Sequence, residues 1–184
     1  FKFEWGRGTL TVNARFNALY DKGKIDYDFA LLYKSYITSK TDTLSIYAYL
    51  KENKIKEGLK SILIELERIK QNGFIEKELE LYKKKHISLM EQDLKSKKTR
   101  ENNSHVSEIS RNFLEDEFVV GEERETELDK KLLKTINVSD LNEAFKKWFK
   151  YDDRIVNFRY PKKIDNKITK DVFLSIENQI KNIQ

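Results

Sequence analysis

A helix, a glycine and a second helix, in residues 54–94, most constrain what this chain can fold into. In residues 54–72 the apolar side chains recur every three or four positions as one stripe: Ile55, Leu59, Ile62, Leu63, Leu66 and Ile69. This spacing predicts an amphipathic helix with one buried face. Gly73 follows, and glycine readily ends a helix because it adopts the left-handed conformation without strain. Residues 54–72 must therefore cover an apolar surface.

The second helix is predicted to begin near Glu76. Acidic residues lie in its first turns and lysines follow, an order that complements the helix dipole. Its apolar stripe is Leu79, Tyr82, His86, Leu89, Met90 and Leu94. His86 is therefore expected on the buried face. Residues 95–103 are polar, and a further set of apolar residues is expected to resume the stripe: Val106, Ile109, Phe113 and Leu114.

The residues before this helix pair favour strands. Residues 1–5 alternate aromatic and charged side chains, which predicts a short strand, and residues 9–20 fit a short helix. Residues 26–38 and 43–50 are rich in Tyr, Phe, Leu and Ile and flank a polar turn, so we expect an antiparallel hairpin. Its second strand places one set of side chains on one face, Leu44, Ile46, Ala48 and Leu50, and Tyr47 and Tyr49 on the other.

The second half predicts more helices and one returning strand. Residues 123–136 form a charged helix, and the next helix starts with Ser139 as its N-cap. The buried face of that helix is Leu141, Phe145, Trp148 and Phe149. Residues 154–160 are predicted to be a strand closed by Pro161, and residues 169–184 an amphipathic helix that packs on another part of the molecule.

These elements predict an α+β fold, in which helices pack on one face of a mostly antiparallel sheet. We expect one domain over residues 1–161, incomplete at its N-terminus, and a linker helix over residues 162–184 that leads to a following domain. Because the chain begins at Phe1 instead of methionine, we interpret it as a processed piece or a fragment of a longer protein.

Composition limits the classes of function. The 184 residues carry a net charge of +5, from 36 basic and 31 acidic side chains that are mostly interleaved. There is no cysteine, which excludes a disulfide framework and a thiolate site. No apolar run approaches the roughly 20 residues that a membrane span needs. The compartment stays open between cytoplasm and periplasm.

Neither histidine stands in a recognisable metal motif. His86 and Glu91 are five positions apart, whereas two zinc ligands on one helix need a spacing of four, as in His-x-x-Glu-His. His105 has Glu101 and Glu108 at helical spacing, a set that surface helices produce by chance. The ordinary interpretation is a core histidine for His86 and a solvated one for His105.

Other candidate sites are equally weak. The carboxylate pairs Asp152-Asp153 and Glu122-Glu123 flank predicted turns, and Gly6-Arg7-Gly8 is too short for a phosphate-binding loop. The residues therefore predict no catalytic residue, no metal ligand and no cofactor in this chain, and they leave any substrate-binding residues unassigned.

Nucleic-acid binding is a further alternative. Nine tyrosines could stack on bases, and two runs of basic residues supply positive charge, Lys83-Lys84-Lys85 and Lys97, Lys98 and Arg100. However, acidic residues share these segments: Glu76, Glu78, Glu80, Glu91 and Asp93. The basic residues also do not cluster beside the tyrosines, so packed rings with solvated hydroxyls are the favoured interpretation. We expect no nucleic-acid partner.

Five short segments stand in one order along the chain: Asn13-Ala14-Arg15-Phe16; Gly73-Phe74 with Glu76-Lys77-Glu78-Leu79, preceded by Glu65-Leu66-Glu67-Arg68; Arg111 to Glu117 with Gly121; Ile136 to Asn142; and Arg154-Ile155-Val156. Taken in this order, they resemble the insulinase/pitrilysin family of zinc metallopeptidases, in its bacterial pitrilysin-like branch. Residues 1–12 match no segment of the family. Ile75 departs from the serine or threonine that is usual before the second helix, so that helix is expected to lack a good N-cap.

The resemblance implies a fold and a function. Members of the family consist of repeated α+β domains, arranged as two halves that enclose a peptide in a chamber, with zinc bound by His-x-x-Glu-His in the first domain. This sequence resembles the second domain, which implies a non-catalytic structural part of a zinc metalloendopeptidase. Its partners would be the other domains of its parent chain and the enclosed peptide. The alternative is a stand-alone α+β interaction or dimerisation module without enzymatic activity.

Overall fold

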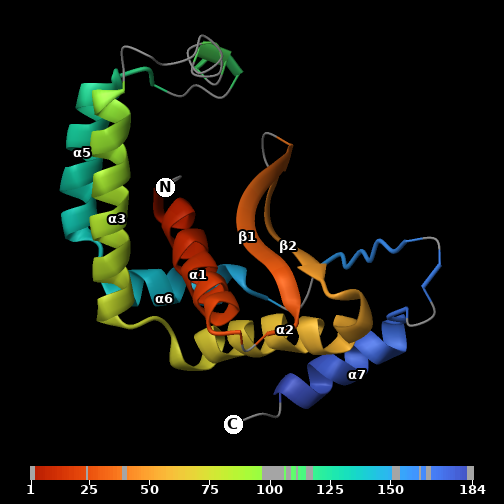
Figure 1. Cartoon of the computed structure of the whole chain (residues 1–184). Helices are drawn as coiled ribbons and strands as arrows, with labels where there is room; N and C mark the ends of the chain where they lie inside the picture. Colours follow the sequence, from red (N-terminus) through yellow and green to blue (C-terminus); the bar gives the residue numbers. More distant parts are fainter. Residues whose placement is uncertain are drawn as a thin grey trace.

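The structure is a computed structural model. It describes residues 3–23, 25–38, 41–96, 106, 109–110, 112–114, 118–150, 154–161, 163–164 and 167–181. The elements, in chain order, are helix α1 (Phe3–Asp21), strands β1 (Tyr27–Thr38) and β2 (Thr41–Leu50), the 3-10 helix η1 (Glu52–Lys54), and helices α2 (Ile55–Asn72), α3 (Glu76–Lys95), α5 (Glu122–Thr135), α6 (Val138–Trp148) and α7 (Lys170–Lys181) (Figure 1).

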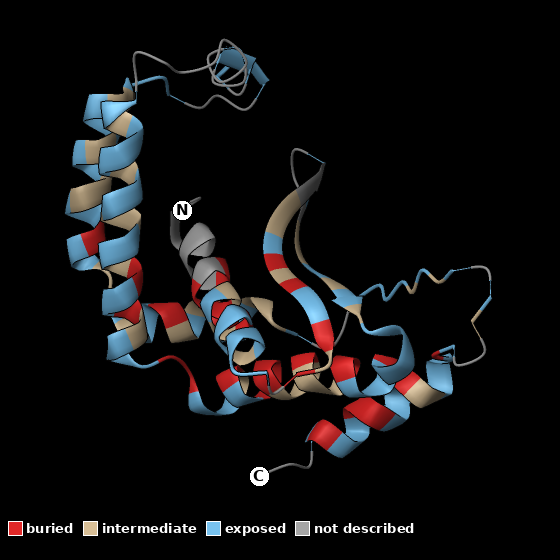
Figure 2. Ribbon diagram, in the orientation of Figure 1, coloured by how far each residue is buried: buried red, intermediate tan, exposed pale blue. Residues whose placement is uncertain are grey.

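The elements form a body and a protruding arm. In the body, α1 packs against β1, α2 crosses one end of the hairpin, and α7 lies along α2 (Figure 1). The arm consists of α3 and α5, which lie side by side. Buried residues concentrate where α1, α2 and the hairpin meet, and most of the arm is exposed (Figure 2). The fold is α+β, with helices on one face of a two-stranded antiparallel sheet.

The predicted hairpin is confirmed. Strands β1 and β2 pair in an antiparallel register that sets Leu32 opposite Ile46 and Ala30 opposite Ala48. The inward side chains Ala30 and Leu32 are buried. On α1, the Asn13 side chain accepts from the Leu32 amide at 2.7 Å and donates to its carbonyl at 2.9 Å. The Asn13 side chain therefore satisfies the Leu32 backbone groups that a neighbouring strand would otherwise bind.

Two apolar clusters hold the body together. The larger joins α1, the hairpin, α2, α3, α5 and α6 through Val12, Phe16, Tyr27, Leu32, Leu66, Ile69, Phe74, Leu79, Leu133, Leu141 and Phe145. The smaller joins α2 and α7 through Ile55, Leu59, Phe173, Ile176 and Ile180. The stripe predicted for residues 54–72 thus covers both the sheet and the last helix. The division into a domain over residues 1–161 and a linker helix over residues 162–184 stays a prediction.

The strand expected at residues 1–5 is wrong for the residues that the structure describes. Helix α1 begins at Phe3 and runs without a break to Asp21. Val12 and Phe16, further along this helix, are buried in the larger apolar cluster. Gly6 and Gly8 lower helix propensity by about 1 kcal/mol each relative to alanine, a cost that neighbouring turns can offset.

The strand expected at residues 154–160 is also absent from the described structure. Its residues have no regular secondary structure and are not part of the sheet. Instead they contact the last helix and the residues before it: Phe158 packs edge-on against Phe173, and the Tyr160 hydroxyl accepts from the Ile168 amide at 2.7 Å. Packing on α7 has replaced the expected pairing with a strand.

Two further expectations need correction. The N-cap of α6 is Asn137, whose side-chain oxygen accepts from the Asp140 amide at 3.0 Å, and Ser139 lies within the helix.

The apolar residues expected to resume the buried stripe are exposed: Val106, Ile109, Phe113 and Leu114. They follow α3 in the chain and belong to neither apolar cluster. On α6, Leu141 and Phe145 are buried as predicted, while Trp148 is half-buried.

Candidate functional site

The joint between α2 and α3 is held by polar contacts from two other helices. Helix α2 ends at Asn72, and the Gly73 amide donates to the Ile69 carbonyl at 2.8 Å. Gly73 has φ +71° and ψ −167°, a backbone conformation that is essentially restricted to glycine. Helix α3 begins at Glu76. We refer to residues 73–75 as the elbow.

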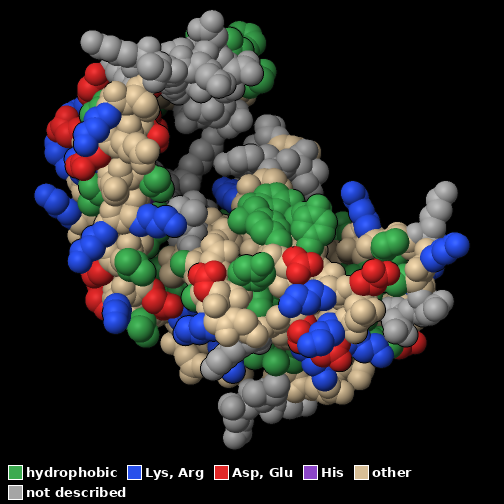
Figure 3. Space-filling view, in the orientation of Figure 1, with side chains coloured by type: hydrophobic (Ala, Val, Ile, Leu, Met, Phe, Trp, Pro, Cys, Tyr) green, Lys and Arg blue, Asp and Glu red, His purple; other side chains and the backbone are tan. Residues whose placement is uncertain are grey.

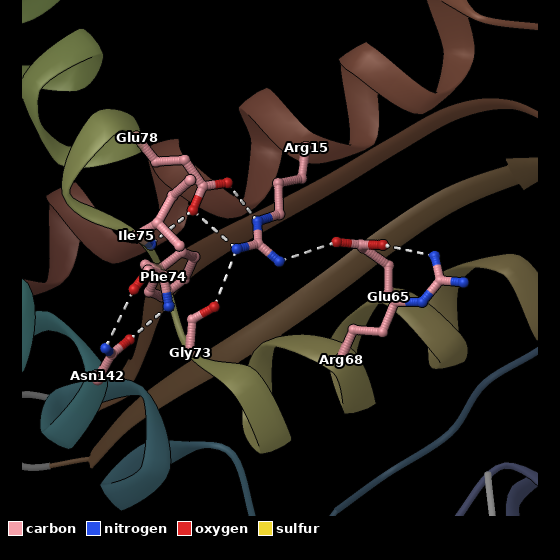
Figure 4. Close-up of polar contacts among 8 residues, drawn as sticks. All are labelled: Arg15, Glu65, Arg68, Gly73, Phe74, Ile75, Glu78 and Asn142. Atoms are coloured by element: carbon pink, nitrogen blue, oxygen red, sulfur yellow. Dashed lines mark hydrogen bonds and ion pairs between the residues drawn. The ribbon is translucent and has the colours of Figure 1, made fainter. Parts of the chain in front are cut away.

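Arg15 of α1 binds the elbow from one side (Figure 4). Its guanidinium donates from Nε and Nη2 to the two carboxylate oxygens of Glu78, at 2.6 and 2.8 Å. Nη2 also donates to the Gly73 carbonyl at 3.0 Å, and Nη1 to Glu65 at 3.1 Å. The planar guanidinium suits such a bidentate pair. One side chain thus connects α1, the end of α2 and the start of α3.

The charges of this site stabilise one another. Burial by itself lowers the pKa of Arg15, but the hydrogen bonds and charges of Glu78 and Glu65 outweigh it and raise that pKa. Burial by itself raises the pKa of Glu78, but hydrogen bonds from Arg15 and the Ile75 amide, with the Arg15 charge, lower it. Burial, with the nearby charge of Glu65, raises the pKa of Tyr27 to about 12. The ion pair is therefore present at neutral pH.

Asn142 of α6 binds the elbow from the other side. Its side-chain oxygen accepts from the Phe74 amide at 2.7 Å, and its nitrogen donates to the Phe74 carbonyl at 3.3 Å. The Phe74 ring is buried, edge-on to Phe145, with the Arg15 guanidinium 5.3 Å from its centre. A Cβ on Gly73 would lie 2.7 Å from the Asn142 amide nitrogen. The elbow is therefore held by α1 and α6 together.

The chemistry of the site is structural. Each of the three guanidinium nitrogens donates to a protein oxygen, and both Asn142 polar atoms are bonded to backbone. Such an arrangement fixes the direction of α3 relative to the body and offers no activated nucleophile, acid or base. No catalytic role is assigned to it.

The residues of the site come from the segments quoted for the family resemblance. Arg15, Glu65, Glu78 and Asn142 lie far apart in the sequence, and each belongs to one of those segments. Residue spacing alone could not predict that they meet, since an ion pair across 63 positions leaves no periodic pattern. The only available signal was the resemblance itself.

Of the two histidines, His86 lies within the described residues. The His86 ring stacks on Tyr82, and its Nε2 lies 3.6 Å from Asp129 on α5, beyond hydrogen-bond distance. His86 is half-buried, between the two helices of the arm. Glu91 forms an ion pair with Lys130 at 2.6 Å instead. His105, Glu101 and Glu108 lie outside the described residues.

The other candidates are only partly described by the structure. Of the basic runs, Lys83 pairs with Glu80 at 2.9 Å, while residues 97–100 lie outside the described part, as do Asp152 and Asp153. Glu122 and Glu123 lie in the first turn of α5. Among the residues that the structure describes, no three His, Cys, Asp or Glu side chains converge as metal ligands. None of the helices in that part is both long and apolar enough to span a membrane.

Comparisons with known proteins identify the fold. No protein-family profile and no curated protein sequence matches the chain. Among solved structures, the periplasmic protease PqqL from Escherichia coli matches all of this chain, with a TM-score of 0.86 and 18% identity over 21% of PqqL. A predicted insulinase family protease from Yersinia pestis matches 95% of the chain, with a TM-score of 0.72 and 16% identity over 38% of that protein.

A third match is the ferredoxin protease FusC, solved as a mutant in complex with Arabidopsis ferredoxin. It matches 97% of this chain, with a TM-score of 0.73 and 18% identity over 20% of FusC. The structure of the first half of PqqL matches with a TM-score of 0.85 and 18% identity over 40% of its length. This chain therefore spans between a fifth and two fifths of the structures that it matches. It has an insulinase/pitrilysin-like fold and resembles one domain of these proteases.

Proposed function

We propose that this chain is a non-catalytic structural domain of a zinc metalloendopeptidase that degrades peptides in an enclosed chamber. The observation that carries the proposal is the match to PqqL, in which the whole chain corresponds to about a fifth of a protease. A match of this kind is what a single domain of a larger enzyme gives. The shared fold does not by itself establish the shared activity.

The elbow supports a role in architecture. Arg15 and Asn142 fix the path of the chain from α2 into α3, and α3 with α5 forms an arm that extends away from the body. A domain that forms part of a chamber wall must hold its surfaces at fixed positions. An arm held at its base by an ion pair and two backbone hydrogen bonds meets this requirement.

Zinc in the parent protein is part of the proposal, and the residues of this chain do not fit that metal. The full sequence contains no His-x-x-Glu-His, and its two histidines are 19 positions apart. In the structure His86 faces a single carboxylate, that of Asp129. Zinc sites in enzymes have three protein ligands or more. The zinc of the parent would be held by its first domain.

Metal content and activity test the proposal. The parent protein is expected to bind one zinc ion and to cleave peptides, whereas this chain alone should bind no stoichiometric zinc and cleave nothing. Atomic absorption after dialysis measures the first property, and a quenched fluorescent peptide measures the second. Tight stoichiometric zinc with peptidase activity in this chain alone would overturn the non-catalytic assignment.

The coding sequence upstream of Phe1 separates the proposal from the stand-alone module. A His-x-x-Glu-His on a helix of a preceding domain supports the protease. A reading frame that consists of this chain alone supports an interaction or dimerisation module instead.

A further inference from the structure

The only Asn-Gly pair of the sequence, Asn72-Gly73, stands where α2 meets the elbow. Asn72 is the last residue of α2 and is exposed, whereas Gly73 is buried. The amide nitrogen that follows an asparagine can attack the carbonyl carbon of its side chain. A glycine in the second position favours this attack, because it has no Cβ to shield the nitrogen and its backbone turns freely. The pair therefore has the chemistry of a deamidation site.

The folded elbow opposes this attack. The Gly73 amide donates to the Ile69 carbonyl at 2.8 Å and so continues the hydrogen-bond pattern of the helix. An amide held in this way points along the helix axis, not toward the side chain of Asn72. Arg15 holds the next carbonyl, that of Gly73, at 3.0 Å, which keeps the peptide units on both sides of Gly73 from turning. The nitrogen can reach the Asn72 side chain only after these hydrogen bonds break.

From this we infer that Asn72 is a site of spontaneous deamidation, and that opening of the elbow sets the rate. In the open state the Gly73 nitrogen loses its proton to a solvent base and bonds to Cγ of Asn72. The bond from Cγ to Nδ2 breaks, and the nitrogen leaves as ammonia with a proton from water. A second water hydrolyses the cyclic imide at one of its two carbonyl carbons, which gives aspartate or isoaspartate at position 72. The reaction needs only water, and the inference does not depend on the proposed function.

Either product weakens the elbow. An aspartate places a negative charge at the C-terminal end of α2, where the helix dipole disfavours it. An isoaspartate adds a methylene group to the backbone just before Gly73 and shifts the carbonyl that Arg15 binds. Figure 3 shows acidic and basic side chains interspersed over the part of the body where α2 lies, so one more carboxylate creates no charged patch there. The effect is therefore local, at the base of the arm.

Incubation at neutral pH tests the inference on three samples: the folded chain, the chain unfolded in urea, and a synthetic peptide of residues 67–77. Mass spectrometry of a digest quantifies deamidation at Asn72, and chromatography separates aspartate from isoaspartate. The peptide and the unfolded chain should react at similar rates. The folded chain should react more slowly by about an order of magnitude or more, because the reaction waits for local opening.

Arg15→Lys tests the dependence on the elbow. Lysine keeps the charge but not the planar fork that binds Glu78 and the Gly73 carbonyl together, so deamidation of the folded variant should be severalfold faster than in the wild type. Arg124→Met, which removes an exposed pair within α5, should leave the rate unchanged. Should Arg15→Lys not fold, urea below the unfolding transition of the wild type provides the same test, and the rate should rise with its concentration.

Three results would overturn the inference. Equal rates in the folded chain and the peptide would show that the elbow gives no protection. Absence of reaction at Asn72 in the urea-unfolded chain would remove the site itself. A folded Arg15→Lys variant with the wild-type rate, or a rate that urea below the transition leaves unchanged, would separate the chemistry from the opening of the elbow.

Discussion

Arg15 on α1 and Glu78 on α3 form a bidentate ion pair across 63 positions of sequence, with distances of 2.6 and 2.8 Å. The same carboxylate accepts from the Ile75 amide at 2.9 Å. The Ile75 side chain has no polar atom and makes no capping hydrogen bond to α3, as expected from the sequence. Glu78 therefore makes the half of a capping box that bonds the N-cap amide, and at the same time it ties the start of the arm to the first helix.

Replacing Arg15 with methionine should destabilise the protein markedly. The change keeps much of the side-chain volume but leaves Glu78 and the buried Glu65 without their shared cation. Removing one partner of a buried pair costs about 3–5 kcal/mol, and because Arg15 and Glu78 are partly exposed we expect about 2–4 kcal/mol here. Urea unfolding followed by tryptophan fluorescence measures the loss.

Arg124→Met provides a matched control. Arg124 pairs with Glu127 at 2.6 Å within α5, but both side chains are about half exposed. Exposed pairs contribute little because water and salt screen them. If the two arginine variants lost equal stability, the special role of the Arg15 site would be refuted.

Acid should weaken the elbow through Glu78. The pKa of Glu78 in the folded protein lies below its ordinary value of 4.5, chiefly because Arg15 overcomes the effect of burial. A carboxyl group of this kind contributes its full stability above the unfolded-state pKa and loses it as the pH falls through the folded-state pKa. The free energy of unfolding should therefore decrease below about pH 4.5.

The variant Glu78→Gln should be less stable at pH 7 and should lose less stability on acidification than the wild type. Urea unfolding from pH 7 to pH 3 gives both profiles. Glu177, whose pKa Arg154 lowers, contributes to the acid response in both proteins and cancels in the comparison. Parallel profiles would contradict the assignment of this acid response to Glu78.

Local patterns predicted much of this fold. The stripe in residues 54–72 identified the helix that contacts both apolar clusters, and Gly73 marked its end. The alternation in residues 43–50 predicted a strand with tyrosines on one face. These predictions succeed because the burial of a helix or strand face imposes its period on the sequence. The elbow has no such period, since Arg15, Glu65 and Asn142 come from three different helices.

The wrong predictions share a physical cause. Residues 154–160 have the composition of a strand, yet Phe158 packs on Phe173 of α7 and Tyr160 binds the backbone just before that helix. Tertiary packing therefore overrode β-propensity. Phe113 and Leu114 continue an apolar pattern, yet they are exposed and belong to neither apolar cluster. A hydrophobic pattern shows which side chains gain from burial, and only the tertiary structure shows whether another apolar surface lies close enough to cover them.

The N-cap of α6 offers a test between the expected residue and the observed one. Asn137 accepts from the Asp140 amide at 3.0 Å, and Asp140 accepts from the Asn137 amide at 3.1 Å. Loss of such a cap costs about 1 kcal/mol. Asn137→Ala should therefore lower the free energy of unfolding by about that amount, while Ser139→Ala, on the exposed first turn, should change it little. The reverse order would restore Ser139 as the cap.

Gly73→Ala should be among the most damaging small substitutions in this protein. At φ +71° and ψ −167° a residue with a Cβ is strained by about 1–3 kcal/mol. The new methyl group would also lie 2.7 Å from the Asn142 side chain, which would have to leave Phe74. Losing those hydrogen bonds adds about 1–3 kcal/mol, so the total should reach several kcal/mol.

Gly23→Ala separates strain from collision. Gly23 also has a positive φ, +62°, but a Cβ there meets nothing within 4 Å. Its substitution should cost about 1–2 kcal/mol, as expected for a left-handed alanine alone. In the double variant Gly73→Ala with Asn142→Ala the collision is absent. The stability lost by the double variant should therefore be smaller than the sum of the losses of the two single variants. Strict additivity would contradict the expected collision between a methyl group at position 73 and the Asn142 side chain.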